Sequence, residues 1–218
     1  MPTSARSGSS RWLLRASGFA VAALCLIYAL VLAAGLLTLP APDRPIQQPW
    51  FTLMEWLILL IAPAMVAFSA AVHGLVAEEG KSLALLGVIF MGLCAGLTCV
   101  LHFSILMLSR QPGFVDAAWA RQVFAFEWPS LVYALDILAW DVFFALGALC
   151  LGGAITGSGR AALARKLLYF SGILALVGLI GVPLADMSLR NIGILGYAVV
   201  FPVAAAVLAR DAGRSAAP

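Results

Sequence analysis

Two aspartates, Asp136 and Asp141, lie within an otherwise apolar stretch, Pro129 to Gly153, that is long enough to cross a membrane. An ionised carboxylate near the centre of a bilayer costs about 2.5–3.5 kcal/mol on insertion scales, so such a residue usually has a buried partner or a function. These two aspartates are therefore the first positions at which we expect chemistry.

Three ionisable residues on different apolar stretches fall at one depth. From the helical rise per residue, Glu55, His102 and Asp136 lie about 8 to 10 Å from the outer ends of their helices, whereas Asp141 lies about 18 Å down. If His102 meets either carboxylate, its imidazole is held protonated or shares a proton, and the shared proton is what a relay needs. The alternative is a hydrogen-bonded cluster that only fixes the register of the helices.

Asp136 and Asp141 are predicted to face in different directions. Five residues of α-helix separate them by about 140°, so they are not expected to form a carboxylate dyad on one face. Asp136 shares its face with Tyr133 and Trp140, which suits the lining of a cavity. Asp141 shares its face with Ala and Gly residues, which let another helix approach closely. We therefore predict a functional role for Asp136, and for Asp141 a packing role with a hydrogen bond to a neighbouring helix.

The candidate site is thus an intramembrane polar cluster in which no catalytic residue is assigned. Its predicted members are Glu55, His102, Asp136, Tyr133 and Trp140, with Asp141 and His73 as secondary candidates. The two histidines are predicted to lie about 25 Å apart along the membrane normal, too far to ligate one haem iron. The sequence has no H-E-x-x-H and no zinc-type spacing of Cys and His, so neither a metal nor another cofactor is expected.

The composition places these residues in a membrane protein. Of the 218 residues, 63% are hydrophobic and 11% are charged, and the mean hydropathy is +1.05. A soluble domain carries about 25% charged residues. The apolar runs do not alternate with polar residues, as the strands of a membrane barrel would. The predicted fold class is all-α, and nucleic acid is not an expected partner.

Six apolar runs are long enough, or nearly so, to span about 30 Å of hydrocarbon as helices. These predicted spans are residues 18–39, 50–77, 82–108, 129–155, 167–185 and 192–208. They form a bundle of six transmembrane helices, one domain at 17–209, between tails at 1–16 and 210–218. Residues 1–10 and 211–218 are small and polar and are expected to be disordered. The first span, of about 22 residues, exceeds a signal-peptide core and is predicted to be retained.

The distribution of Lys and Arg predicts the orientation of the spans. One side of the predicted membrane carries nine of these residues, and the other carries Arg44, Arg110, Arg121 and Arg190, which completes the 13 in the chain. Because cytoplasmic loops are enriched in basic residues, both termini are predicted to be cytoplasmic. The expected location is a bacterial-type inner membrane. Asp186 and Arg190 flank the last external turn, where we expect a weak surface pair.

The longest connection, Ser109 to Trp128, carries apolar residues at helical spacing, namely Val115, Trp119, Val123 and Phe126. This spacing places them on one face, which predicts a short helix lying in the membrane interface. A lid over a cavity is the alternative.

Gly92 and Gly96 have the G-x-x-x-G spacing inside an apolar run. Small residues at this spacing allow close contact between helices, either within the bundle or in a homodimer. The lipid bilayer and a second copy of the chain are therefore the predicted partners.

Two segments, YALDILAWDVFFALGAL (Tyr133–Leu149) and GYAVVFP (Gly196–Pro202), resemble segments of uncharacterised bacterial integral membrane proteins with six spans. Those proteins carry no assigned activity, so the resemblance implies no function.

Three classes of function fit these residues. The favoured hypothesis is a small proton- or ion-coupled transporter or permeation module, with Glu55, His102 and Asp136 as its polar site and residues 109–128 as a gate. One alternative is a membrane-embedded enzyme that acts on a lipid or quinone-like molecule with the same residues as acid and base. The other is a non-catalytic accessory or sensor subunit in which the buried charges only lock the fold. The absence of a nucleophile–base or metal signature argues against the enzyme, and the absence of an internal repeat argues against the transporter.

Overall fold

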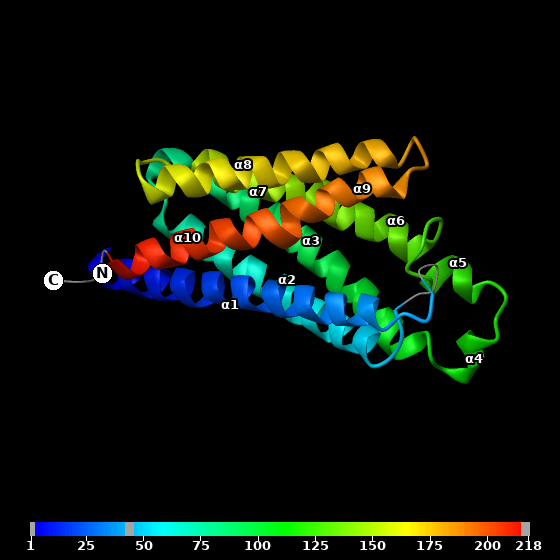
Figure 1. Cartoon of the computed structure of the whole chain (residues 1–218). Helices are drawn as coiled ribbons and strands as arrows, with labels where there is room; N and C mark the ends of the chain where they lie inside the picture. Colours follow the sequence, from blue (N-terminus) through cyan, green and yellow to red (C-terminus); the bar gives the residue numbers. More distant parts are fainter. Residues whose placement is uncertain (1–2, 42–45, 215–218) are drawn as a thin grey trace.

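A computed structural model describes residues 3–41 and 46–214 of the chain, with side chains described only between residues 8 and 212. The described residues are helical with turns and contain no strand. Six helices are long and apolar enough to cross a membrane, which confirms that part of the prediction. Figure 1 shows these six helices lying side by side.

The first three spans are continuous helices, and the last three are composite. The first three are α1 (Thr3–Leu37), α2 (Trp50–Leu75) and α3 (Lys81–Leu108). The fourth consists of α6 (Leu131–Ile137), the π-helical segment η2 (Leu138–Phe144) and α7 (Ala145–Ala154). The fifth is α8 (Arg160–Gly178) with the 3₁₀ turn η3 (Leu179–Gly181). The sixth consists of α9 (Met187–Ile194), the π-helical segment η4 (Leu195–Val200) and α10 (Phe201–Arg214).

The helices extend further towards both termini than predicted. The expectation of disorder is wrong for residues 3–10, which belong to α1, and for residues 211–214, which belong to α10. The start of α1 is ordered because it packs on the end of α2. A Cβ added to Gly74 of α2 would lie only 3.1 Å from the Ser10 Cβ. Residues 1–2 and 215–218 lie outside the described part of the chain.

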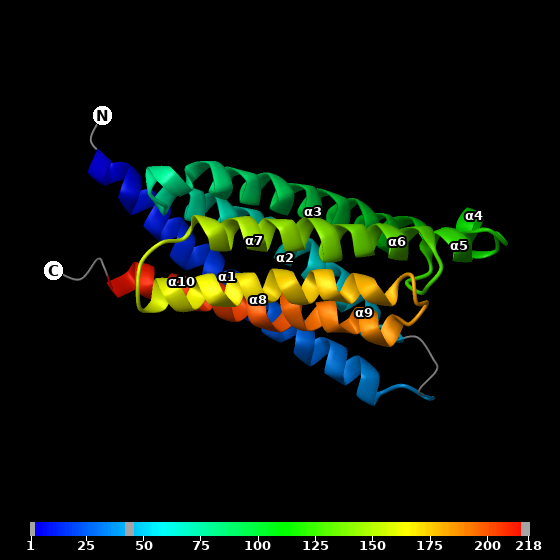
Figure 2. The ribbon, with the colours of Figure 1, turned by 90° about the horizontal axis from the view of Figure 1, so that it is seen from above.

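The start of α1 and the end of α10 lie at the same end of the molecule, here called the termini end (Figure 1). The opposite end carries α4 (Pro112–Val115) and α5 (Ala120–Phe124) and is called the loop end. Helix α1 contacts α2 and α10, and α3 contacts α2 and α7. Helix α8 contacts α7 and α10. Figure 2 shows that α1 crosses the other helices obliquely.

A layer of phenylalanines lies at the centre of the packed helices. Phe68, Phe144 and Phe201 are fully buried. The Phe201 ring packs edge-on against the other two, at centroid distances of 5.6 Å to Phe68 and 5.1 Å to Phe144. Segment η2 ends at Phe144, and η4 ends immediately before Phe201. π-helical turns occur frequently at functional sites. Because both π-helical segments adjoin this layer, we expect a functional site on one side of it or the other.

The connection at the loop end does not form the single interfacial helix that the apolar spacing predicts. It contains two short helices, α4 and α5, and the turn between them breaks the helical face. The Phe114 ring packs against the rings of Trp119 and Phe124, each at a centroid distance of 5.6 Å. The prediction of one helix is therefore wrong, because aromatic contacts fold the connection back on itself.

Some glycines lie at close contacts between helices, and others lie on open helix faces. A Cβ on Gly172 would lie 2.8 Å from the Ala145 carbonyl oxygen, so α7 and α8 touch there. At Gly92 and Gly96 a Cβ would meet no described atom within 4 Å. These two glycines thus make no close contact within the described chain, and their role in a homodimer stays a prediction.

We expect the change Gly172→Ala to lower the free energy of unfolding by about 1–3 kcal/mol, because the added methyl group overpacks the contact between α7 and α8. The matched control Gly92→Ala adds the same methyl group to an open face and should change stability little. Thermal unfolding of the purified protein in detergent measures both. Equal midpoints for the two variants would contradict the close packing of α7 on α8.

Candidate functional site

Four spans bring five ionisable side chains into one buried group at the loop end. Glu55 comes from α2, His102 from α3, Asp136 from α6, Asp141 from η2 and Arg190 from α9, and all five are buried. Three of them, Glu55, His102 and Asp136, are the residues that the sequence places at one depth. The structure brings these three together, and their role stays a prediction. We call the five residues the ionic cluster.

His102 lies between two carboxylates. Its Nδ1 is 2.9 Å from Glu55 Oε2, a hydrogen bond. Its Nε2 is 3.7 Å from Asp136 Oδ1, within ion-pair range but too long for a hydrogen bond, and has no hydrogen-bond partner. A neutral imidazole donates from one nitrogen only, whereas a protonated one donates from both. The position of His102 therefore allows a proton to serve either carboxylate.

Arg190 pairs with both aspartates, Asp136 and Asp141, whereas the sequence predicts that it lies at the surface. Its Nη2 donates to Asp136 Oδ2 at 3.0 Å, and its Nε donates to Asp141 Oδ2 at 3.1 Å. Its side chain is 4% exposed. The predicted surface pair of Asp186 with Arg190 is wrong, because Asp186 caps α9 by accepting hydrogen bonds from the backbone N–H groups of Ser188 and Leu189.

Glycines explain why Arg190 lies in the interior. A Cβ on Gly178 would lie 2.9 Å from the Arg190 carbonyl oxygen, and a Cβ on Gly181 or Gly193 would also collide with neighbouring atoms. Helix α9 thus lies close against α8 and η3 and carries the guanidinium inwards. Gly178, Gly181 and Gly193 are thus the feature of the sequence that could have indicated a close approach of α9 and a buried Arg190.

The predicted separation of Asp136 from Asp141 is also wrong. Both carboxylates reach the same guanidinium because the chain between them enters the π-helical segment η2. A π-turn closes i to i+5 hydrogen bonds, so residues five apart lie nearer to one face than in an α-helix. The predicted hydrogen bond from Asp141 to a neighbouring helix is present. Its second oxygen, Oδ1, has no hydrogen-bond partner, and a Cβ added to Gly193 would collide with this oxygen.

The ionic cluster holds more negative than positive charge when its carboxyl groups are ionised. Three carboxylates then face one guanidinium and one imidazole, so a protonated His102 leaves one excess negative charge and a neutral His102 leaves two. An uncompensated charge is costly in a buried environment. Proton uptake is the direct way to lower this cost. Further titratable groups lie around the cluster, namely Tyr28 and Cys25 on α1, Cys94 on α3, Tyr133 on α6 and Tyr197 on η4.

A cavity of about 210 Å³, here called the loop-end cavity, borders the ionic cluster. Two of its lining residues, Asp136 and Arg190, are charged members of the cluster. Four are aromatic: Tyr28, Phe126, Trp140 and Tyr197. The remainder are Cys25, Leu32, Ile58, Ile61, Ile194 and Ala198. The cavity therefore offers apolar and aromatic walls beside one ion pair.

Three other predicted site residues, Tyr133, Trp140 and His73, do not belong to the ionic cluster. Tyr133 is buried, and its ring centroid is 5.1 Å from the Arg190 guanidinium carbon, a cation–π contact. Trp140 lines the loop-end cavity. His73 lies apart from the cluster near the end of α2, where its carbonyl accepts a hydrogen bond from Lys81 Nζ at 2.7 Å. Among the described residues, no group of three or more His, Cys, Asp and Glu side chains is arranged to hold a metal ion.

Phe126, in the connection between α5 and α6, reaches over the ionic cluster. Its ring centroid is 5.6 Å from that of His102 and 5.4 Å from that of Tyr133. The connection thus places the ring of Phe126 at the loop-end cavity, and the lid stays a hypothesis.

The same connection carries an exposed ion pair. Arg121 Nε donates to Glu127 Oε1 at 2.7 Å, and this carboxylate raises the pKa of the Arg121 guanidinium above its ordinary value.

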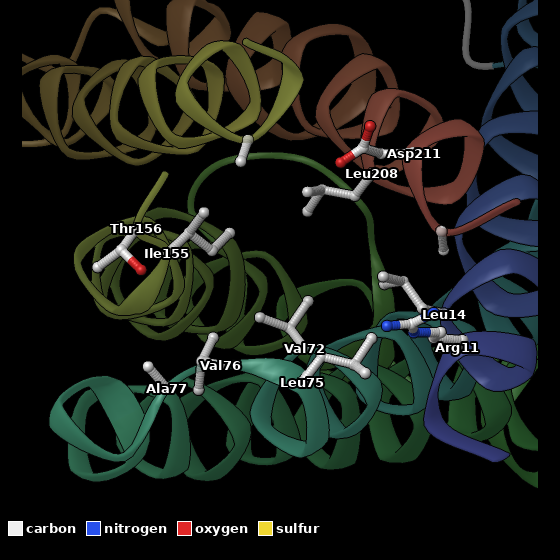
Figure 3. Close-up of a pocket in the computed structure, with 12 residues that line it drawn as sticks. Arg11, Leu14, Val72, Leu75, Val76, Ala77, Ile155, Thr156, Leu208 and Asp211 are labelled. Carbon is white, nitrogen blue, oxygen red and sulfur yellow. The ribbon is translucent and has the colours of Figure 1, made fainter. Parts of the chain in front are cut away.

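A second cavity, of about 290 Å³, lies at the termini end (Figure 3). Its apolar lining includes Leu14, Val72 and Leu208, and Arg11 and Asp211 also line it. Helices α1 and α2 contribute to both cavities. The sixth span contributes through α9 and η4 to the loop-end cavity and through α10 to the second cavity. Along α2 and the sixth span, Phe68 and Phe201 of the buried phenylalanine layer lie between the residues that line the two cavities. No pattern in the sequence predicts this second cavity.

Comparison with known proteins adds no assignment, since no family model, no curated protein and no solved structure matches this chain.

We expect Arg190→Gln to lower the free energy of unfolding by about 3–5 kcal/mol, because it leaves two buried carboxylates without their cation. The matched control is Arg121→Gln, which removes an exposed ion pair worth about 0–1 kcal/mol. Adding Asp141→Asn to Arg190→Gln should restore part of the loss. Unfolding titrations in mixed micelles provide the comparison, and an Arg190→Gln protein as stable as the parent would show that the guanidinium does not hold the spans together.

Proposed function

We propose that this protein is a proton-coupled transporter of a small molecule, with six transmembrane helices packed as a bundle in a bacterial inner membrane. Both termini are cytoplasmic in this proposal, so the loop end faces outwards. The excess of Lys and Arg on the side of the termini supports this orientation. It is further supported by the buried position of Arg190, which takes one basic residue out of the external count.

The observation that carries the proposal is the contact between the ionic cluster and the loop-end cavity. Asp136 belongs to both, because it lines the cavity, pairs with Arg190 and approaches His102. A molecule that enters the cavity therefore changes the electrostatic surroundings of a carboxylate that already needs positive charge. In this way the binding of cargo and the binding of a proton become linked at one residue.

The proton is proposed to move along Glu55, His102 and Asp136. The imidazole accepts a proton on one nitrogen and releases it from the other, which suits a residue between two carboxylates. Arg190 is a fixed charge that holds Asp136 and Asp141 in place. Asp141 is then a positioning residue, and Glu55, His102 and Asp136 carry the mobile proton.

Two cavities at opposite ends fit a transport cycle in which one opens while the other closes. The phenylalanine layer of Phe68, Phe144 and Phe201 is the barrier between them. Segments η2 and η4 meet this barrier, and Ser171 Oγ donates to the Gly196 carbonyl within η4 at 2.9 Å. A shift between π-helical and α-helical turns in these segments would rotate Phe144 and Phe201 and so open the path.

The enzyme hypothesis has one supporting observation. The loop-end cavity is lined mostly by apolar and aromatic side chains beside a carboxylate, which also suits a lipid or quinone-like molecule. A lipid or quinone that copurifies with the protein and is converted by it would replace the transport proposal.

In proteoliposomes with an imposed pH gradient, we expect the wild-type protein to accumulate cargo from a panel of small organic solutes. Asp136→Asn should reduce this gradient-driven uptake at least about tenfold, because it removes the carboxylate shared by cargo and proton. Asp116→Asn, at an exposed position at the loop end, is the matched control and should retain full uptake. Wild-type uptake equal to that of empty liposomes across the panel would refute proton-coupled transport.

Cysteine labelling tests the orientation. In a variant without the four native cysteines, Ser158→Cys and Ala118→Cys place single thiols at exposed positions at opposite ends of the helices. In intact cells, a membrane-impermeant maleimide should label residue 118 and not residue 158, and permeabilisation should expose the latter. The reverse pattern would place the termini outside.

A further inference from the structure

The side chains that line the loop-end cavity suit one kind of molecule. Its walls carry four aromatic rings, including Trp140 and Tyr197, whose ring centroids are 4.9 Å apart. Aromatic faces carry partial negative charge and attract cations, with Trp the strongest among them. The lining is thus suited to an organic group that carries positive charge.

The net charge beside the cavity points in the same direction. Arg190 is the one cation among the lining residues, and two of its nitrogens already donate to Asp136 and Asp141. Its charge is therefore neutralised by the cluster, whose three carboxylates outnumber its cationic groups. A bound anion would meet this negative excess, whereas a bound cation would lower it.

One carboxylate oxygen remains available to such a cation. Asp136 Oδ2 accepts a hydrogen bond from Arg190, but Oδ1 has only the long contact to His102, at 3.7 Å. Asp136 lines the cavity, so this carboxylate and the aromatic walls act on the same space.

We propose that the loop-end cavity is a binding site for a small organic cation, such as a quaternary ammonium group that carries an aromatic ring. The aromatic faces of Trp140, Tyr197, Tyr28 and Phe126 surround the cation, and Asp136 supplies the opposing charge. That this cation is the transported cargo rests on the proposed function, whereas the binding site itself does not.

Three probes of nearly equal shape test the site. Phenyltrimethylammonium is a cation, tert-butylbenzene is its neutral isostere, and benzenesulfonate is an anion of similar size. Binding of each is measured by calorimetric titration of the full-length protein in uncharged maltoside micelles, with protein-free micelles as the reference. We expect the cation to bind at least about tenfold more tightly than either other probe, because only the cation gains from both the aromatic faces and the carboxylate.

Matched variants locate the binding. Trp140→Leu should weaken binding of the cation about two- to thirtyfold through the lost cation–π contact, whereas Trp140→Phe, which keeps a ring, should retain most of the affinity. Trp56→Leu is the control, because Trp56 is 49% exposed on α2 and does not line the cavity. Size-exclusion profiles establish that each variant is folded before titration.

The outcomes separate the two proposals. Preference for benzenesulfonate, equal binding of cation and isostere, or equal effects of Trp140→Leu and Trp56→Leu would each overturn the cation site. Selective binding of the cation without gradient-driven uptake would keep the site and refute transport as the function.

Discussion

The guanidinium of Arg190 lies between two carboxylates in the interior of the molecule, and most of the loop end depends on this arrangement. Through Asp136 and Asp141 it ties the sixth span to the fourth. Through Asp136, His102 and Glu55 the same chain of contacts continues to the third and second spans. Removing a single partner from such a chain leaves a buried charge without compensation, which is far more costly than losing a surface ion pair.

Two local features of the chain allow this interaction. Glycines at positions 178, 181 and 193 let the backbones of the fifth and sixth spans approach closely, so that Arg190 enters the interior. The π-helical segment η2 turns Asp141 towards the same guanidinium as Asp136. Helices in a membrane gain little from the hydrophobic effect when they associate, so close packing and polar contacts carry more of the specificity.

The number of spans and the shared depth of Glu55, His102 and Asp136 could be predicted from the sequence, because both depend only on apolar length and on the rise of a helix. The partners of these residues could not, because contact depends on how each helix is rotated. The sequence predicts Arg190 at the surface because it follows a turn and has an aspartate four residues before it. Regular α-helical geometry predicts Asp141 on another face from Asp136, but the segment that carries Asp141 is π-helical.

Proton-coupled transport requires that the ionic cluster takes up and releases a proton inside the membrane. Infrared difference spectroscopy on the protein in lipid, between about pH 5 and about pH 8, follows the C=O band of carboxylic acids and the ring bands of histidine directly. We expect a reversible protonation signal that is clearly smaller when Glu55→Gln and His102→Gln are combined with Asp136→Asn, and that is unchanged when the exposed Asp116→Asn is introduced instead. A difference spectrum that is the same in wild type and in the triple variant would contradict proton exchange at this cluster.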